Sequence, residues 1–251
     1  MFLSKLVVNI GEDPTRYRPA REWLRNLYRV HQRLWMGFAG EREPVTGSDT
    51  DYPYSPDRLE HAALPKAPFL FRVETYRPAV ILVQSILPPL WERAFWNAEY
   101  LLDQRQPWLV KDEYEPAIEC GLRFSFRLLA NPVRKVATIP KKRRERPDQP
   151  GRHGRRVPVP PESFGEWLSA RSEAHGFRLV APIQDTLHMQ VGYVYVNKTR
   201  DPTKGQRLRS VRYDGLLEVL DEERFRESLL SGIGPAKAFG FGLLSIAPVR
   251  I

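Results

Sequence analysis

Cysteine is nearly absent from this sequence of 251 residues, in which Cys120 stands alone. A single thiol cannot form an internal disulfide bond or supply a cysteine-based zinc site, which excludes a disulfide-stabilised secreted domain and a zinc finger. Histidine is sparse as well, and no two of the five histidines lie three or four residues apart, so no helix carries a histidine metal pair. These absences indicate a reducing compartment, and we expect a cytoplasmic protein that requires no metal and no other cofactor.

Long apolar runs are lacking too. The best candidate for a membrane span, residues 79–83, ends at Gln84, well short of the ~20 residues that cross a bilayer. The first ten residues have no long apolar core and no cleavage-like site, so they do not resemble a secretion signal. We expect neither a membrane anchor nor a membrane partner.

What the sequence does contain is a local concentration of positive charge. The formal net charge is +9, and residues 134–156 hold ten basic and two acidic side chains, which leaves 29 basic and 28 acidic residues elsewhere. Recurring prolines exclude an interior helix or a central strand over most of this segment and favour a linker or an extended arm. Such dense charge indicates a polyanionic partner, with a solvated linker as the alternative. The basic residues are Arg134, Lys135, Lys141, Lys142, Arg143, Arg144, Arg146, Arg152, Arg155 and Arg156.

The first half of the chain switches between strand and helix periodicity. The pattern predicts strands over residues 3–10, 69–75, 80–85 and 122–130, and helices over residues 19–38 and 88–104. In chain order these elements run strand, helix, strand, strand, helix, strand, which is the order of a ferredoxin-like domain. Residues 40–66 have no clear period and are expected to form a long surface loop.

The second half predicts another mixed unit. We expect helices over residues 163–175 and 221–231, and strands over residues 177–180, 187–196, 208–219 and 243–248. The fold class is therefore α+β, with two tandem ferredoxin-like (RRM-like) domains and antiparallel sheets. The predicted boundaries are residues 1–133, a basic arm over residues 134–160, and residues 161–251. Because ferredoxin-like sheets commonly serve RNA recognition, RNA is favoured over DNA as the polyanion.

The predicted helix over residues 19–38 carries two neighbouring stripes. Trp23, Leu27, Val30 and Leu34 recur at helical spacing and are expected to be buried, while Leu24, Tyr28, His31 and Trp35 form the adjoining stripe. The second stripe puts a phenol and an imidazole near each other. For an isolated pair of this kind, packing with a hydrogen bond is the commoner explanation, and catalysis is the alternative.

A glycine-rich segment lies near the C-terminal end. Gly232, Gly234, Gly240 and Gly242 surround Lys237, so backbone N–H groups and one lysine charge are available to a phosphate. The segment matches neither the dinucleotide fingerprint nor a Walker loop, because Lys237 stands where the first needs glycine and no Gly-Lys-Ser/Thr sequence occurs. A phosphate contact and a tight structural connection are both open interpretations.

Five segments taken together resemble the CasE family of CRISPR RNA-processing endoribonucleases, which are subunits of type I-E Cascade complexes. They are residues 3–8 (LSKLVV), 27–35 (LYRVHQRLW), 69–74 (FLFRVE), 129–133 (LANPV) and 232–248 (GIGPAKAFGFGLLSIAP). The similarity extends from the first predicted strand to the last. It implies a metal-independent cut at the base of the repeat stem-loop and retention of the CRISPR RNA together with other Cascade subunits.

The resemblance also implies roles for individual residues. His31 is implied as the principal catalytic residue with Tyr28 as its partner, the basic arm as an arginine-rich hairpin that grips the RNA stem, and the glycine-rich segment with Lys237 as a loop beside the RNA. A third, cationic group is expected before Tyr213, where Lys204 and Arg207 are rival candidates. A non-catalytic subunit that binds RNA hairpins is the alternative function.

Overall fold

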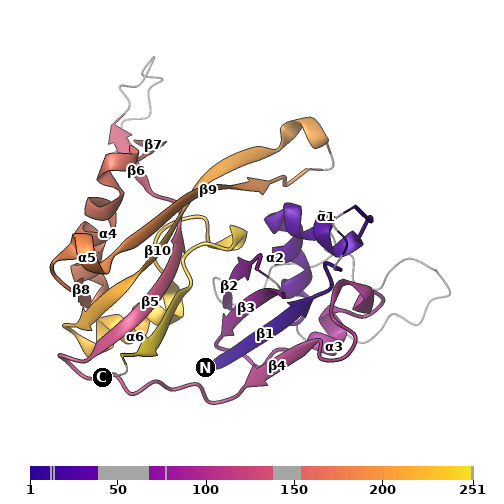
Figure 1. Ribbon diagram of the computed structural model, residues 1–251, viewed down its shortest axis with the longest axis horizontal. Helices are drawn as coiled ribbons and strands as arrows, with labels where there is room; N and C mark the ends of the chain where they lie inside the picture. Colours follow the sequence, from indigo (N-terminus) through magenta and orange to yellow (C-terminus); the bar gives the residue numbers. More distant parts are fainter. Residues whose placement is uncertain are drawn as a thin grey trace, which may run out of the picture.

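The computed structural model describes residues 1–38 except 12 and 14, residues 68–137 except 77, and residues 154–249 except 200. These residues form two antiparallel sheets with their own helices, lying side by side, and a separate two-stranded ladder (Figure 1). The predicted loop over residues 40–66 and the middle of the basic arm lie outside the described residues. In the described part of the chain, no helix is both long and apolar enough to cross a membrane.

The first sheet has the strand order β2-β3-β1-β4. Apolar residues from its strands pack with helices α1 and α2 into one core that includes Leu6, Phe71, Ile81, Val30 and Leu34. The elements of this unit are β1 (Phe2–Val8), α1 (Pro19–Arg25), α2 (Leu27–Trp35), β2 (Phe69–Glu74), β3 (Ala79–Ser85), α3 (Trp91–Ala94) and β4 (Trp108–Lys111). The predicted strands over residues 3–10, 69–75 and 80–85 are confirmed.

The predicted helix over residues 19–38 is interrupted at Asn26. The Asn26 side chain accepts a hydrogen bond from the Tyr28 backbone N–H at 3.2 Å, which is the bond of a helix N-cap. Its backbone is extended, with φ −119° and ψ 96°, so α1 ends and α2 begins there. Both predicted stripes are present despite the break, because most residues of each stripe lie in α2.

The predicted helix over residues 88–104 is wrong for most of its length. Only α3 and a 3₁₀ turn over Glu99–Leu101 are helical there. Asn97 between them has φ 58°, and this left-handed conformation cannot continue a right-handed helix. Strand β4, which follows, was missed because Leu109 and Val110 are both exposed and therefore give no alternating pattern.

The second sheet has the order β11-β5-β10-β8, with β9 paired to β10. Taken along the chain, its strands β5, β8, β10 and β11 correspond to β1, β2, β3 and β4, so both sheets have the same strand order. The elements are β5 (Arg123–Ala130), α4 (Phe164–Ser172), β8 (Phe177–Leu179), α5 (Ile183–Thr186), β9 (His188–Val196), β10 (Gln206–Val219), α6 (Glu222–Ser231) and β11 (Leu244–Pro248). They confirm the helices and strands predicted for the second half.

Strand β5 belongs to this second sheet and not to the first. The sequence analysis assigned residues 122–130 to the first unit as its last strand, but β5 pairs with β10 and β11. Phe124, Phe126 and Leu128 are buried in the second core, as their alternation predicts. Alternation identifies a strand with one buried face but does not identify the sheet that buries it, and β4 takes the place that β5 was expected to fill.

The two ends of the basic arm pair with each other. Strand β6 (Val133–Ala137) runs antiparallel to β7 (Gly154–Pro158), and Lys135 lies directly opposite Arg156. The described ends of the arm therefore form a two-stranded antiparallel ladder. In Figure 1 the ladder stands at the edge of the second unit, next to α4.

Candidate active site

Helix α2 presents Tyr28 and His31 on its half-buried side. Leu27, Val30 and Leu34 are buried in the first core, while Tyr28 and His31 are each partly accessible to solvent. Because the N-cap at Asn26 fixes the first turn, Tyr28 occupies a defined position at the start of the helix. The predicted division into a buried stripe and a neighbouring, more accessible stripe is therefore confirmed, whereas the catalytic roles stay predictions.

The imidazole of His31 lies among aromatic rings. Its ring centroid is 5.2 Å from that of Phe69 and 6.1 Å from that of Phe71, with interplanar angles of 32° and 26°. Trp35, one turn further along α2, lies 5.7 Å away. Packing against three rings restricts the side-chain rotation of His31, so the imidazole is held in one orientation before any substrate binds.

The second unit completes the surroundings of Tyr28. Phe239, in the 3₁₀ turn Lys237–Phe239, has its ring centroid 6.1 Å from that of Tyr28. The Nζ atom of Lys198 also contacts this ring, at 5.3 Å from the Phe239 centroid. A phenol from the first unit and an ammonium group from the second therefore share one aromatic neighbour.

A reciprocal pair of hydrogen bonds brings Lys198 to this position. The Asn26 side chain donates to the Asn197 carbonyl at 3.1 Å, and its oxygen accepts from the Asn197 N–H at 3.1 Å. Both asparagines are buried. Asn26, which caps α2, therefore also fixes the turn after β9. Lys198 follows Asn197 directly in that turn.

The rival cations from the sequence analysis are placed differently. Lys204 is exposed and forms an ion pair with Asp201 at 3.5 Å. Arg207 pairs across the ladder with Tyr195, whereas Val194, on the other face of β9, packs against the first core. Because neighbouring residues of a strand point to opposite faces, Arg207 is on the face turned away from α2. The sequence analysis did not single out Lys198. The one signal for it in the sequence is its position in the polar turn after a predicted strand.

The glycine-rich segment packs against the first unit. Gly232 has φ 73°, and a Cβ atom there would lie 2.8 Å from Leu70 Cδ1 and 2.9 Å from the Gly242 carbonyl oxygen. Gly240 has φ 77°, and its Cβ would lie 3.2 Å from Leu27 Cδ1 and 3.3 Å from Phe71 Cε2. These glycines are needed so that the loop can approach β2 and α2 closely. The segment therefore has a structural role. Its contact with RNA stays a prediction.

Lys237 is partly withdrawn from solvent. Its Cγ atom would be 3.3 Å from a Cβ at Gly242, so the alkyl chain lies along the loop. Burial lowers the pKa of the Lys237 amine. Burial also lowers the pKa of His175, and the nearby positive charge of Lys237 adds to that shift. Lys198 is the cation that contacts the aromatic neighbour of Tyr28, because its Nζ atom lies over the Phe239 ring.

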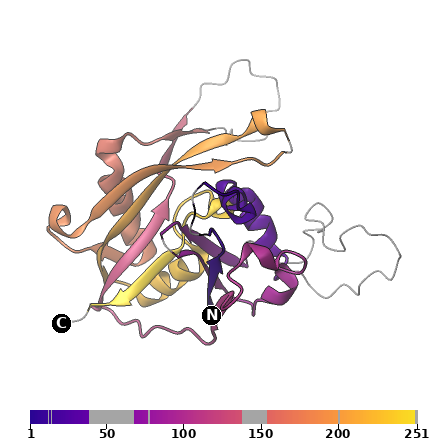
Figure 2. The same ribbon diagram turned by 45° about the vertical axis from the view of Figure 1, so that its right-hand side comes forward.

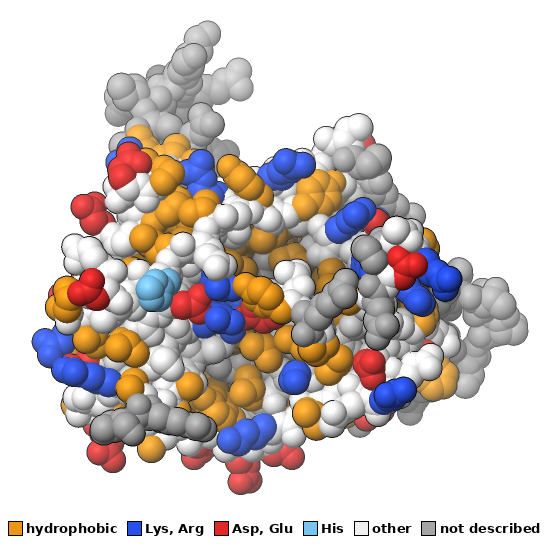
Figure 3. All heavy atoms as spheres, in the orientation of Figure 1, with side chains coloured by type: hydrophobic (Ala, Val, Ile, Leu, Met, Phe, Trp, Pro, Cys, Tyr) orange, Lys and Arg blue, Asp and Glu red, His pale blue; other side chains and the backbone are white. Residues whose placement is uncertain are grey.

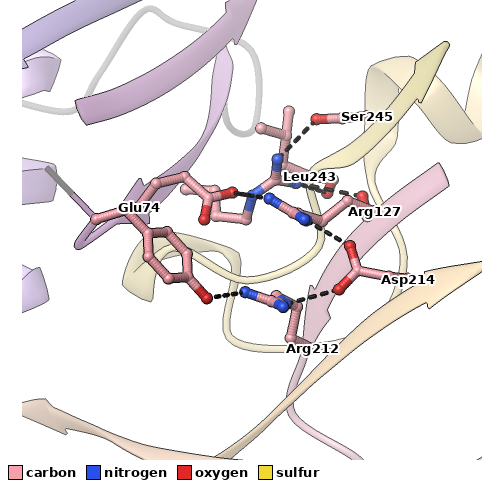
Figure 4. A network of polar contacts seen from close by, with 8 residues as sticks. Glu74, Arg127, Arg212, Asp214, Leu243 and Ser245 are labelled. Atoms are coloured by element: carbon pink, nitrogen blue, oxygen red, sulfur yellow. Dashed lines mark hydrogen bonds and ion pairs between the residues drawn. The ribbon is translucent and has the colours of Figure 1, made fainter. Parts of the chain in front are cut away.

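A network of charges joins the two sheets behind this site. Arg72 of β2 is 3% exposed, and its guanidinium donates to Glu74, to the carbonyls of Arg127 and Leu243, and to Ser245, at 2.8–3.2 Å (Figure 4). Burial lowers the pKa of Arg72, because desolvation outweighs the adjacent Glu74 carboxylate. Arg127 also binds Asp214, and this hydrogen bond raises the pKa of Arg127. Arg72 thus ties the strand that packs against His31 to the end of the glycine-rich segment.

The described ends of the basic arm carry exposed cations. Arg134, Lys135 and Arg156 are exposed, and Lys135 and Arg156 face each other across the β6–β7 ladder. Like charges directly opposite each other destabilise a ladder unless an anion lies between them. The arrangement fits the predicted polyanionic partner. Lys141, Lys142, Arg143, Arg144, Arg146 and Arg152 lie outside the described residues, as does the side chain of Arg155.

Comparison with known proteins assigns the class. Residues 1–248 match the family described as CRISPR associated protein, so the chain belongs to the CRISPR-associated proteins. It is 31% identical to the CRISPR-associated endoribonuclease Cse3 of Thermus thermophilus, over 99% of this chain and 100% of that one. It is 28% identical to the Cascade subunit CasE of Escherichia coli, again over 99% and 100%. Within the class, the chain belongs to the Cse3/CasE family of endoribonucleases, which confirms the resemblance seen in the sequence motifs.

A solved structure extends the similarity to three dimensions. The structure of Thermus thermophilus Cse3 bound to an RNA that represents a pre-cleavage complex matches with a TM-score of 0.66 and 29% identity, covering 98% of each chain. The similarity therefore spans both units and the junction between them. The candidate site lies at this junction, with Tyr28 and His31 on one side and Lys198 and Phe239 on the other.

Proposed function

We propose that the protein cleaves CRISPR repeat transcripts at the base of their stem-loop and stays bound to the product as a Cascade subunit. The observation that carries this proposal is the junction at which Tyr28 of α2 contacts Phe239, whose ring also contacts Lys198. His31 lies three residues after Tyr28 on the same helix, among Trp35, Phe69 and Phe71. Membership of the Cse3/CasE family supports it, because relatives are named as endoribonucleases and as Cascade subunits. The repeated strand order supports two ferredoxin-like domains, each built around one sheet.

The proposed reaction uses the RNA as its own nucleophile. The ribose 2′-hydroxyl attacks the adjacent phosphorus, and the bond to the 5′-oxygen breaks, which leaves a 2′,3′-cyclic phosphate and a 5′-hydroxyl. This transesterification needs a proton acceptor, a proton donor and stabilisation of negative charge on the phosphorane, all of which side chains can supply. No step of this route requires a metal ion.

Each side chain has a role that follows from its chemistry. Imidazole exchanges protons near neutral pH, so His31 transfers a proton either from the 2′-hydroxyl or to the leaving oxygen. The Tyr28 hydroxyl donates a hydrogen bond to the phosphate or orients the nucleophile. Lys198 provides a point charge for the developing oxyanion. The β6–β7 hairpin binds the stem and thereby positions its base at the junction.

The experiment that tests this proposal uses the protein's own repeat RNA in EDTA. We expect cleavage to proceed at the same rate with and without the chelator, and the products to carry the two ends named above. An RNA with a single deoxyribose before the cut should bind normally and remain whole, because it lacks the nucleophile. Cleavage of that RNA would contradict the mechanism, and binding without cleavage of the normal RNA would favour a non-catalytic subunit.

Lys198 gives a prediction that separates it from the earlier candidates. Replacing Lys198 with alanine should slow single-turnover cleavage by about 10²- to 10³-fold, the usual effect of removing one group that stabilises a developing oxyanion. Lys204→Ala is the matched control, because Lys204 is an exposed lysine a few residues away, and its rate should be unchanged. A loss of rate in Lys204→Ala with none in Lys198→Ala would reverse the assignment.

A further inference from the structure

An exposed apolar face runs along the ribbon formed by β9 and β10. Met189, Val191, Tyr193 and Tyr195 alternate along β9 and therefore point to the same side. Their exposed fractions are 43%, 55%, 66% and 36%. We call these four residues the ribbon face. Contiguous apolar side chains on the surface of a soluble protein usually mark a binding site.

The ribbon face is an extension of the second core beyond the helices that cover it. Val211 and Tyr213 pair with Val191 and Met189, so they share the same side, yet both are fully buried. Tyr213 donates to the Phe164 carbonyl and stacks on Trp167 of α4. The same apolar alternation continues along β9 in the ribbon face, whose side chains no described helix buries.

The opposite side of the ribbon is already occupied. Val194 packs against the first core, and the hydrogen bonds between Asn26 and Asn197 fix the end of the ribbon there. Figures 1 and 2 both show the β9–β10 ribbon extending over α1 and α2. The ribbon is therefore held in place from that side, and its other side is accessible to a ligand.

Cations accompany the ribbon face. Arg209 and Arg207 pair with Tyr193 and Tyr195 and thus lie on the same side. The Arg209 guanidinium donates to the Val159 carbonyl at 3.2 Å, and the Val159 N–H donates to the Pro132 carbonyl at 3.1 Å, which fixes the base of the β6–β7 hairpin to the ribbon. Figure 3 shows hydrophobic and basic side chains next to each other over this part of the surface.

We propose that the ribbon face binds unpaired nucleotides of the RNA that flank the stem, with a base stacked on Tyr193. Aromatic side chains stack on the faces of unpaired bases, which are hidden within a duplex, and cations beside them neutralise the phosphates. Tyr193 and Arg207 provide this combination next to the hairpin that grips the stem. The inference rests on the proposed function, since it takes the stem to lie on the hairpin.

Two RNAs and three variants test the inference. One RNA is the repeat hairpin with its natural unpaired flanks, and the other is the same hairpin with blunt ends. Tyr193→Ala should weaken binding of the flanked RNA by about 5- to 100-fold and leave the blunt hairpin unaffected, because one base–aromatic stack is lost. Tyr193→Phe should bind as the wild type does. Tyr100→Ala, which alters another exposed tyrosine on the first unit, is the matched control and should change neither affinity.

A fluorescent base reports stacking directly. Single 2-aminopurine substitutions along the unpaired flanks should reveal one position that is quenched on binding to the wild type and not to Tyr193→Ala. Equal affinities of Tyr193→Ala and the wild type for the flanked RNA would overturn the inference. So would an equal loss for both RNAs, or unchanged RNA binding with weaker association to the other Cascade subunits, which would assign the face to a protein. Failure of this inference can be distinguished from failure of the proposed function, because in the second case the wild type would not cleave its repeat RNA at all.

Discussion

Replacing His31 with glutamine should slow single-turnover cleavage of the repeat hairpin by about 10²- to 10⁴-fold, the range that general acid–base catalysis supplies. Glutamine fills much of the same space and can donate a hydrogen bond, but it does not exchange protons near neutral pH. RNA affinity should be unchanged, since the proposed grip on the stem comes from the β6–β7 hairpin. The measurements are a cleavage time course at saturating protein and a binding titration with the deoxyribose RNA.

Packing around His31 requires a control for misfolding. The imidazole lies against Phe69, Phe71 and Trp35, so a change of rate could also arise from a disturbed core. His31→Ala opens a space beside these rings, and added imidazole should restore part of its cleavage rate if the lost group is a proton carrier. A His31→Gln rate close to that of the wild type would contradict the catalytic role. Loss of RNA binding in both variants would instead indicate a structural one.

Replacing Arg72 with methionine should lower the free energy of unfolding by about 3–5 kcal/mol, because it removes the buried partner of an ion pair together with the hydrogen bonds that this partner donates. Glu74 would lose its buried partner and keep only the longer ion pair with the more exposed Arg127, at 3.5 Å, and the acceptors on Arg127, Leu243 and Ser245 would lose a donor. The measurement is the midpoint and slope of urea unfolding. Cleavage should also slow in protein that remains folded, since Arg72 connects the strand behind His31 to the glycine-rich segment.

Arg178→Met is the matched control for Arg72. Arg178 pairs with Glu218, but its side chain is 58% exposed, so its loss should change stability by no more than about 1 kcal/mol. Arg72→Lys keeps the charge but cannot reach all four acceptors, and it should fall between the wild type and Arg72→Met. Equal stability of Arg72→Met and Arg178→Met would show that the network contributes nothing specific to the junction of the two units.

Local patterns in the sequence predicted most strands and the helix that carries Tyr28 and His31, because these depend on periodicity alone. Phe124, Phe126 and Leu128 identified β5 by alternation, and Tyr28 and His31 were placed together by the spacing of α2. The sheet that receives β5 depends instead on contacts with β10 and β11, which lie far away in the sequence. Periodicity contains no information about such partners.

The residues that meet at the candidate site show the same limit, because periodicity does not reveal contacts between distant parts of the chain. The turn that carries Lys198 is held at the junction by hydrogen bonds between Asn26 and Asn197, which lie 171 positions apart. The sequence therefore did not single out Lys198 and favoured Lys204, which pairs with Asp201, and Arg207, which lies on the face turned away from α2. The glycine-rich segment was correctly singled out, yet its close packing against Leu70, Leu27 and Phe71 became evident only from the fold.

The junction between the two units also determines when activity can arise during synthesis of the chain. Ribosomes make Tyr28 and His31 early, whereas Lys198 emerges much later and Phe239 later still. The proposed catalytic set is therefore completed only once the chain up to Phe239 has left the ribosome and the Asn26–Asn197 bonds have formed. A truncated product that ends before Phe239 would carry Tyr28 and His31 but lack the aromatic ring that Tyr28 shares with Lys198, so we expect incomplete chains to cleave RNA more slowly than the full chain.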